Sequence, residues 1–578
     1  MVPISRINSA FPVLILLLAF LLPFAPRTYA SNNVPLDSPV YYYLDKLASF
    51  GLVSSDFKGI RPITKAEAAR LLFEAEKIRI QERKRTIVDE DEESSYADFR
   101  GLIGEKRVIG GGELAREMIR ELRHLLEREC ALIDEPESVP YFELNPVTTY
   151  KMRYVYLDGA PRSYERLVHD PGDDGVFGIG GGLRPPNPYP SVVRQHGSEG
   201  TPLLENHEGV VYRKGTNLDF RFNGEAHIGR YFSALVEPML LYSKSDASMQ
   251  GRLNKAYAKL GGGALELEVG RDANWLGLGE RGNITLTNNG KNFDLIKISS
   301  TEPISTRYLW DLKYSVIFSR FDDTVTGGQE RRPFLMALKL SLKPAANLEL
   351  GINYGKQFGG PGVNNSISAY VKGILGGTGS DNTNNLAGIE LRWRIPYLRN
   401  TEIYGEFSGE DSASFWPIVE SYVGGIFIPR LSNDGRNDLR FEYFLGNSIL
   451  YTSGTFPGGY IYKGLPIGHS QGGAAQDFFL RYRHWFSARN CLMLDYIHGE
   501  RGNLGRVPVD GSGSLDQLNG AMQAVERRNV YRLWWYFPLN ELMNFSIMYG
   551  RERIHNFNLV GGARKTNELV TTQLSYRF

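Results

Sequence analysis

The sequence has little of what marks most other protein classes of its length. Only two of its 578 residues are cysteines, and Cys130 and Cys491 lie so far apart in the chain that we predict two unpaired buried thiols. Lysine and arginine number 66 against 65 aspartates and glutamates, so there is no basic excess and we expect no nucleic-acid partner. After the first thirty residues no apolar run of eighteen residues occurs, which argues against a transmembrane helix.

What the sequence does contain is glycine and aromatic residues. There are 63 glycines, 32 tyrosines and 30 phenylalanines, a composition typical of an outer-membrane β-barrel. A closed barrel is also the only other fold that satisfies its backbone hydrogen bonds in lipid.

Residues 1–30 have the pattern of a secretory signal peptide. Arg6 supplies a positive charge, and residues 11–22 form an apolar stretch that is too short to cross a bilayer as a helix. Small residues then stand near a cleavage point before Ser31, and no cysteine follows it for lipid attachment. We therefore expect an exported chain that loses residues 1–30.

Residues 31–145 are predicted to form a helical region. Ser38 with Pro39 starts a helix that continues to residue 50 and stops at Gly51. The sequence TKAE at 64–67 is a capping box for a second helix, and a third is predicted over 113–132. Three short amphipathic helices can form a small bundle or pack on a larger body.

From about residue 146 to residue 578 the apolar period changes from 3.6 to 2. Apolar residues alternate with polar ones in about eighteen segments, for example Leu218, Phe220 and Phe222, or Leu439, Phe441 and Tyr443. The predicted fold is an all-β transmembrane barrel of about eighteen antiparallel strands, preceded by an N-terminal periplasmic α-helical region. A soluble β-sandwich array would also give this alternation.

The connections between these segments alternate in length. Short ones are expected at 223–225, 261–263, 343–345, 487–490 and 538–540, and long ones at 158–209, 271–292, 358–385, 448–476 and 501–526. An outer-membrane barrel has this asymmetry, with tight periplasmic turns and long outer loops. We therefore expect the chain in the outer membrane, in contact with its lipid, with helices in the periplasm and long loops at the surface. The terminal Phe578, two residues after Tyr576, predicts recognition by the barrel-assembly machinery.

Two stretches resemble the Wzi family of capsule-assembly outer-membrane proteins. The first comprises VPLDSP at 34–39, YLDKL at 43–47 and RPIT at 61–64. The second comprises GR at 270–271, WLGLG at 275–279, GNITLTNN at 282–289 and FDLI at 293–296. The resemblance implies an eighteen-stranded barrel with periplasmic helices and a lectin role at the cell surface. Leu276 and Leu278 stand where the family commonly has a second tryptophan and a proline, so the glycan specificity does not transfer.

The 271–292 loop holds the candidate polysaccharide-binding residues. Sugar sites combine aromatic faces with planar polar groups, and this loop offers Arg271, Trp275, Glu280, Arg281, Asn288 and Asn289. The alternative is a structural turn, in which glycines supply special backbone angles and Arg271 makes an ion pair in the lumen.

Catalytic and cofactor sites are not expected. Asp170, Asp173 and Asp174 lack the glutamate of a calcium loop, and the nine histidines show no metal-ligand spacing. We therefore predict no cofactor, no metal site and no enzyme activity.

The leading hypothesis is a barrel that binds or organises capsular or extracellular polysaccharide. The first alternative is a porin or conduit, for example the sheath of a porin–cytochrome complex. The second alternative is a membrane enzyme, which would need a hydroxyl group beside a histidine on one face of the barrel.

Overall fold

The structure is a computed structural model. It describes residues 29–92, 112–170, 191–306, 310–326, 329–366, 368, 383–410, 417, 419–447, 449–502, 517–518, 521–522 and 524–577. Residues 1–28 of the predicted signal peptide, the aspartates at 173 and 174, and Phe578 lie outside this part of the chain.

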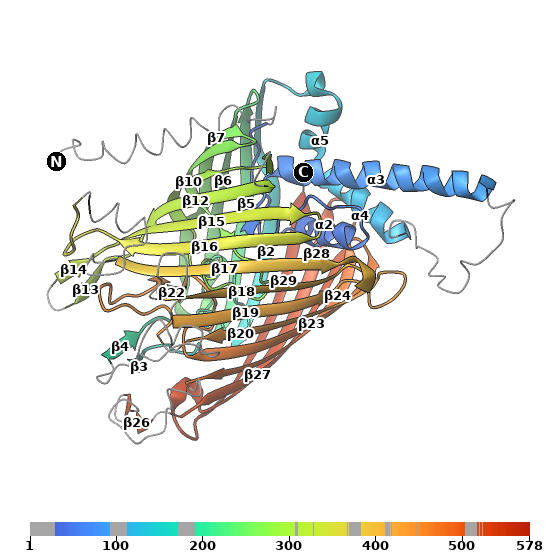
Figure 1. The fold of residues 1–578 in the computed structure, drawn as a ribbon. Helices are drawn as coiled ribbons and strands as arrows, with labels where there is room; N and C mark the ends of the chain where they lie inside the picture. The colour runs from blue at the N-terminus through green and yellow to red at the C-terminus, as the bar shows by residue number, and fades with distance from the viewer. Residues whose placement is uncertain are drawn as a thin grey trace.

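Within the described residues, eighteen antiparallel strands form one closed barrel, as predicted (Figure 1). Each strand pairs with its neighbour in the chain, and the last closes the ring on the first, with Tyr576 opposite Tyr150 and Leu569 opposite Leu157. The strands are β2 (Phe142–Asp158), β5 (Gly215–Ile228), β6 (Phe232–Ser243), β7 (Ser248–Gly262), β8 (Leu265–Asp272), β10 (Phe293–Ser299), β12 (Asp311–Arg320), β15 (Phe334–Ala345), β16 (Leu348–Phe358), β17 (Thr383–Ile395), β18 (Thr401–Glu410), β19 (Val419–Ile428), β20 (Asn437–Gly446), β23 (Ala475–Ser487), β24 (Asn490–Arg501), β27 (Glu526–Pro538), β28 (Met543–His555) and β29 (Arg564–Arg577).

Shorter strands pair within the connections. They are β1 (Ile60–Arg61) with β9 (Trp275–Leu276), β3 (Arg166–Asp170) with β4 (Ser191–Gln195), β13 (Thr324–Thr326) with β14 (Gln329–Arg331), β21 (Ile461–Tyr462) with β22 (Leu465–Pro466), β25 (Gln517–Leu518) with β26 (Ala521–Met522), and β11 (Ile304–Ser305) with β12.

Four α-helices precede the barrel in the described chain: α2 (Pro39–Ser49), α3 (Lys65–Glu92), α4 (Gly112–Leu125) and α5 (Glu127–Asp134). The hydroxyl of Thr64 accepts the backbone N–H of Glu67 at 3.1 Å, which is half of the predicted capping box. The other half is not formed, because the Glu67 carboxylate pairs with Arg70. The predicted third helix is interrupted at Leu126, whose φ is −122°. No helix among the described residues is both long enough and apolar enough to cross a membrane.

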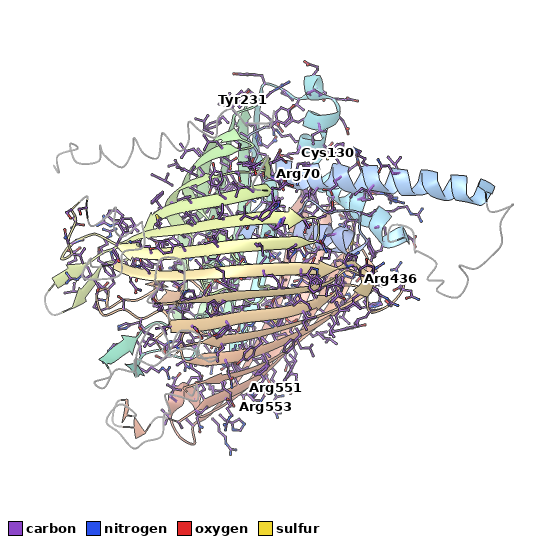
Figure 2. The ribbon with its side chains drawn as sticks, in the orientation of Figure 1. Arg70, Cys130, Tyr231, Arg436, Arg551 and Arg553 are labelled. Atoms are coloured by element: carbon purple, nitrogen blue, oxygen red, sulfur yellow. The ribbon has the colours of Figure 1, made fainter. Side chains whose placement is uncertain are left out.

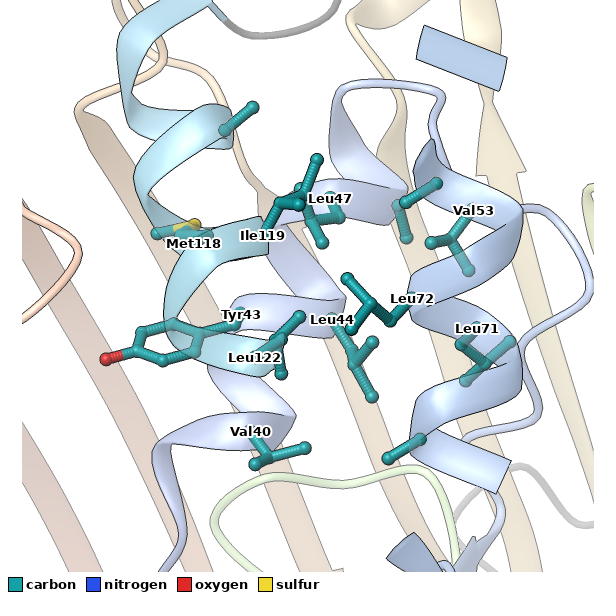
Figure 3. Close-up of a cluster of buried hydrophobic side chains, with 14 of the residues drawn as sticks. Val40, Tyr43, Leu44, Leu47, Val53, Leu71, Leu72, Met118, Ile119 and Leu122 are labelled. Carbon is teal, nitrogen blue, oxygen red and sulfur yellow. The ribbon is translucent and has the colours of Figure 1, made fainter. Parts of the chain in front are cut away.

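The helices pack their apolar faces together and against the base of the barrel. Figure 3 shows the centre of this cluster, with α2, α3 and α4 contributing Val40, Tyr43, Leu44, Leu47, Leu71, Leu72, Met118, Ile119 and Leu122. Trp485 and Met493 join it from the wall. Cys130 and Cys491 lie in the same cluster as buried free thiols, which confirms the prediction.

The two ends of the barrel differ. One end, called the helix end below, carries the helices and short connections such as 229–231, 263–264, 346–347 and 488–489. The other, the loop end, carries the long connections and the hairpins β3–β4 and β13–β14 (Figure 1). Figure 2 places Arg70, Cys130 and Arg436 at the helix end. The predicted alternation of long and short connections is confirmed.

The turn predicted at 223–225 is wrong. These residues lie inside β5, which continues to Ile228. The facing strand β2 bulges between Asn145 and Thr149, and a Cβ on Gly224 would lie 2.9 Å from the Pro146 carbonyl oxygen. The glycine therefore allows a close backbone approach within a strand, and the local sequence does not distinguish this from a turn.

The two faces of the wall have opposite character. On β5, Leu218 and Phe220 are exposed on the outside, whereas Asp219 and Arg221 are buried inside. Other strands repeat the apolar outer face, with exposed Leu240, Leu267, Ile296, Ile389, Leu391, Trp393, Ile403, Ile426, Phe441, Leu480, Leu494, Leu533 and Ile547. An apolar outside with a polar inside is the pattern of a barrel that meets lipid.

Candidate functional site

The lumen of the barrel is occupied from both ends. Residues 29–64, called the strap, enter it at the helix end. Three connections at the loop end, 196–214, 273–292 and 449–474, fold inward and are called the loop plug. Most of their side chains are buried, and polar strand residues that face the lumen hold both parts in place.

Charge fixes the strap to the wall. The Asp56 carboxylate lies 2.7 Å from Arg392, 2.9 Å from Arg394 and 3.3 Å from Lys343. Burial alone would raise the pKa of Asp56, but these three cations hold it well below its usual range. The next charge, Lys58, binds Glu402 at 2.8 Å.

The strap and the loop plug meet in the middle of the lumen. Ile60 of β1 pairs with Leu276 of β9, and the Gly277 N–H donates to the Gly59 carbonyl at 2.8 Å. Beside Asn33 the space left between strap and wall is about 10 Å³, which is close to the volume that one water needs.

The WLGLG turn folds as it does because of its glycines. Gly277 has φ +140°, and a Cβ there would lie 2.3 Å from the Asn283 side chain. That side chain accepts the N–H of Gly279 at 2.7 Å and so closes the turn.

Carboxylates on the wall bind the backbone of this loop. Glu442 of β20 accepts the N–H groups of Glu280 and Arg281, each at 2.6 Å. Glu406 of β18 accepts the N–H of Ile284 at 3.0 Å. Carboxyl oxygens are good acceptors for backbone N–H groups, so these three hydrogen bonds give the loop a fixed height in the lumen.

The 449–474 connection packs on the same loop. The Tyr451 hydroxyl donates to the Ile284 carbonyl at 2.6 Å and accepts the His469 N–H at 2.7 Å. The His469 ring stacks on Phe444, with ring centroids 3.6 Å apart. Burial, together with nearby arginines, lowers the pKa of His469 well below its usual range, so the ring is neutral at pH 7.

The 196–214 connection supplies the charge that balances the arginines of the lumen. Glu205 pairs with Arg281 at 2.9 Å and with Arg532 at 2.8 Å. Burial opposes its ionisation, but these cations and Arg528 hold the pKa of Glu205 well below its usual range. The arginines and glutamates of the plug are thus charged partners of one another.

The structure brings five of the six candidate residues together in the loop plug. Trp275 is buried in β9. Glu280 pairs with Arg481 at 3.3 Å, and the Asn289 amide donates to the Pro466 carbonyl at 2.9 Å. Arg281 pairs with Glu205, and Asn288 is partly buried, with an Oδ1 that has no hydrogen-bond partner.

Arg271 lies apart from the other five. It shares the outward face of β8 with Leu267 and Val269, and its guanidinium forms a two-pronged pair with Asp294 at 2.8 Å. The ion pair suggested for Arg271 is therefore present, but it lies outside the lumen. A shift of one residue in strand phase reverses the face, which explains the error.

Sequence reasoning missed three residues that organise the plug: Glu205, Glu442 and Tyr451. A signal was present for Glu442, which stands between Phe441 and Tyr443 in the polar phase of β20. Nothing local marks Glu205 or Tyr451, because their partners are distant in the chain. Among the described residues, no group of three His, Cys, Asp or Glu side chains is placed to hold a metal ion.

Comparison with known sequences gives two findings. The sequence model of the family described as capsule assembly protein Wzi matches residues 184–569. A Klebsiella pneumoniae protein, described as an uncharacterized 55.8 kDa protein in the cps region, is 34% identical over 94 residues, which is 15% of this chain and 19% of that protein. The chain thus matches about a fifth of the length of this relative.

Comparison with solved structures gives the fold. Escherichia coli Wzi, described as an outer-membrane protein involved in group 1 capsule assembly and as a carbohydrate-binding β-barrel, has a TM-score of 0.61 at 14% identity. The match covers 95% of this chain and 100% of that one. Pseudomonas aeruginosa OccK5 has a TM-score of 0.40 at 11% identity, and the match covers 75% of this chain and 98% of that one.

Proposed function

Since this chain belongs to the Wzi family of capsule assembly proteins, we propose that it is an outer-membrane lectin that holds capsular or extracellular polysaccharide at the cell surface. The carbohydrate-binding barrel of E. coli supports a glycan as the ligand. The apolar outer face of the wall supports outer-membrane lipid as the surroundings.

The observation that carries this proposal against a porin or conduit is the filled lumen. An eighteen-stranded barrel is wide enough for an aqueous channel. Here the strap and the loop plug meet through β1 and β9 across the lumen, and their buried charges are paired with the wall. To act as a conduit, the barrel would need both the strap and the loop plug to leave the lumen.

In this proposal the helices lie in the periplasm and the long loops face the outside, where the loop plug forms the floor of the glycan site. Trp275, Glu280, Arg281 and Asn289 shape that floor. Asn288, which is half-buried, borders that floor, and Arg271 braces the rim. The glycan is bound without chemical change, and the barrel-assembly machinery inserts the chain.

Two measurements test the proposal. Deletion of the gene is expected to release surface polysaccharide into the medium, and the purified barrel is expected to retain that polysaccharide. In a planar bilayer the protein is expected to conduct little. High steady conductance together with no polysaccharide retention would support the conduit and end the lectin proposal.

A further inference from the structure

The rim of the barrel has a step where β7 rises above β8. Pairing between the two strands ends at Ala256 opposite Arg271, yet β7 continues to Ser248 at the loop end. The loop plug covers part of this free edge, where the Asn292 amide donates to the Asn254 carbonyl at 3.0 Å. Arg252 lies on the edge just beyond this contact, and Lys291 is the residue next to Asn292.

Arg252 and Lys291 lack partners, in contrast with the cations around them. Within the described chain, the Nε and Nη2 atoms of Arg252 are buried without an acceptor, and the Lys291 amine meets no carboxylate or carbonyl. Two neighbouring cations are paired, Lys463 with Asp322 at 2.5 Å and Arg271 with Asp294 at 2.8 Å. Buried guanidinium N–H groups without acceptors are costly, so the step lacks hydrogen-bond acceptors that a ligand could supply.

The charges around the step repel one another. Burial lowers the pKa of Lys291, and the positive charges of Arg252 and Lys463 lower it further, while Asp322 is the one carboxylate that opposes them. The carboxylates nearest Arg252 form ion pairs with other cations. Glu208 pairs with Lys255 and Arg221, and Asp219 pairs with Arg221. An anion between Arg252 and Lys291 would relieve this repulsion.

An aromatic ring lies beside these cations. Tyr462 stacks on Phe293 with ring centroids 4.2 Å apart, and it directly precedes Lys463. The Nζ atom of Lys463 lies 5.5 Å from the centroid of the Tyr462 ring, so this ring holds Lys463 in place beside the step. A guanidinium suits a carboxylate, with which it can form two parallel hydrogen bonds.

We propose that Arg252 and Lys291 bind the carboxylate of an acidic sugar in the polysaccharide, with Lys463 at the edge. This inference rests on the lectin function proposed above and specifies the chemistry of its ligand. The ligand class is a polymer that contains uronic acid or another carboxylated sugar.

The test compares an acidic polymer with a neutral one on the purified full-length barrel. Polygalacturonate is expected to bind and dextran to bind weakly. Arg252→Gln and Lys291→Gln are each expected to weaken polygalacturonate binding about tenfold or more, because each removes a charged hydrogen-bond donor. Higher salt is expected to weaken binding to the unaltered protein and to have less effect on the variants.

Arg527→Gln and Arg551→Gln are the matched controls. Both residues lie on strands of the wall outside the loop plug, are exposed, and have a carboxylate partner, Glu500 for Arg527 and Glu568 for Arg551. They make the same change in charge and are expected to leave polygalacturonate binding unchanged. Retained heat-modifiable mobility in detergent gels shows that each variant is folded.

A second readout follows the amine itself. Polygalacturonate is expected to protect Lys291 from an acylating reagent, as seen by mass spectrometry, whereas dextran is not. If dextran binds as tightly and the variants bind like the controls, the acidic-sugar inference is wrong while the lectin function stands. If neither these polymers nor the native polysaccharide bind, the lectin function fails as well. Protection by lipopolysaccharide vesicles alone would assign the step to lipid phosphates and overturn the inference.

Discussion

The strap and the loop plug fill the same lumen by different means. The strap is held by a few buried charges, with Asp56 facing three cations at once. The loop plug also has buried ion pairs, at Glu205, and many hydrogen bonds to its backbone add to them, such as those of Tyr451 and Glu442. A buried charge that loses its partner is far more costly than one missing hydrogen bond, so the loss of Asp56 should cost more stability than the loss of the Tyr451 hydroxyl.

The largest expected effect comes from Asp56→Ala. It leaves Lys343, Arg392 and Arg394 without this carboxylate, and we expect a loss of about 3–5 kcal/mol in the free energy of unfolding. Urea unfolding in detergent micelles measures this loss of stability, and conductance in a planar bilayer reports whether the strap has left the lumen. Asp434→Ala, at an exposed acid of the same end, is the control. Equal losses in the two variants would mean that the buried ion pairs of Asp56 do not hold the strap.

Removal of one hydroxyl group from the loop plug should lower the free energy of unfolding by less. Tyr451→Phe leaves the Ile284 carbonyl and the His469 N–H without this partner, for an expected loss of about 1–3 kcal/mol. Tyr443→Phe, whose hydroxyl donates to Gln476 at 3.3 Å on the outer face, is the control. The same urea titration compares the two. A loss as large as that of Asp56→Ala would contradict the expected difference between a buried charge and a hydroxyl.

A smaller effect is expected where the strap becomes a helix. Thr64→Ala removes the hydroxyl that accepts the Glu67 N–H, at an expected cost of about 1 kcal/mol. Hydrogen exchange in the first turn of α3 is the measurement. Ser38→Ala, which removes a longer contact of 3.4 Å to Val40, should cost less. The reverse order would mean that cap geometry does not set helix stability here.

The last expected effect depends on pH. Burial and the charge of Glu67 raise the pKa of Glu302 to about 7, against the opposing charges of Arg70 and Lys313. The folded state therefore holds a proton that the unfolded chain releases at about pH 4. Stability should be full below about pH 4 and fall as pH rises through 7, seen as faster hydrogen exchange at the start of α3. Glu302→Gln should flatten this profile, and Glu541→Gln, at an exposed acid, should not.

The wall was predictable because its causes are local. An apolar outer face and a charged inner face impose a period of two, and each strand pairs with its neighbour in the chain, so alternation and connection length were enough. The role of Gly224 could not be predicted from its neighbours in the sequence, because it depends on the bulge in the facing strand β2. The family resemblance was confirmed by the match over residues 184–569.

The filling of the lumen was not predictable from the sequence in this way. Asp56 lies 336 residues before Arg392, and Ile284 lies 167 residues before Tyr451. No spacing rule links such pairs, so the sequence singles out the 271–292 loop but not the residues that hold this loop in the lumen. The outward face of Arg271 was missed because strand phase was uncertain by one residue.

The shared location of the two cysteines has a practical consequence. Both are enclosed between the bundle and the wall at the helix end, and burial raises the pKa of the Cys130 thiol to about 11. The native chain should therefore react very little with maleimide dyes. A single cysteine introduced at Lys214 or Arg213 would then give a fluorescent reporter of the opposite end, read in living cells without first removing the natural thiols.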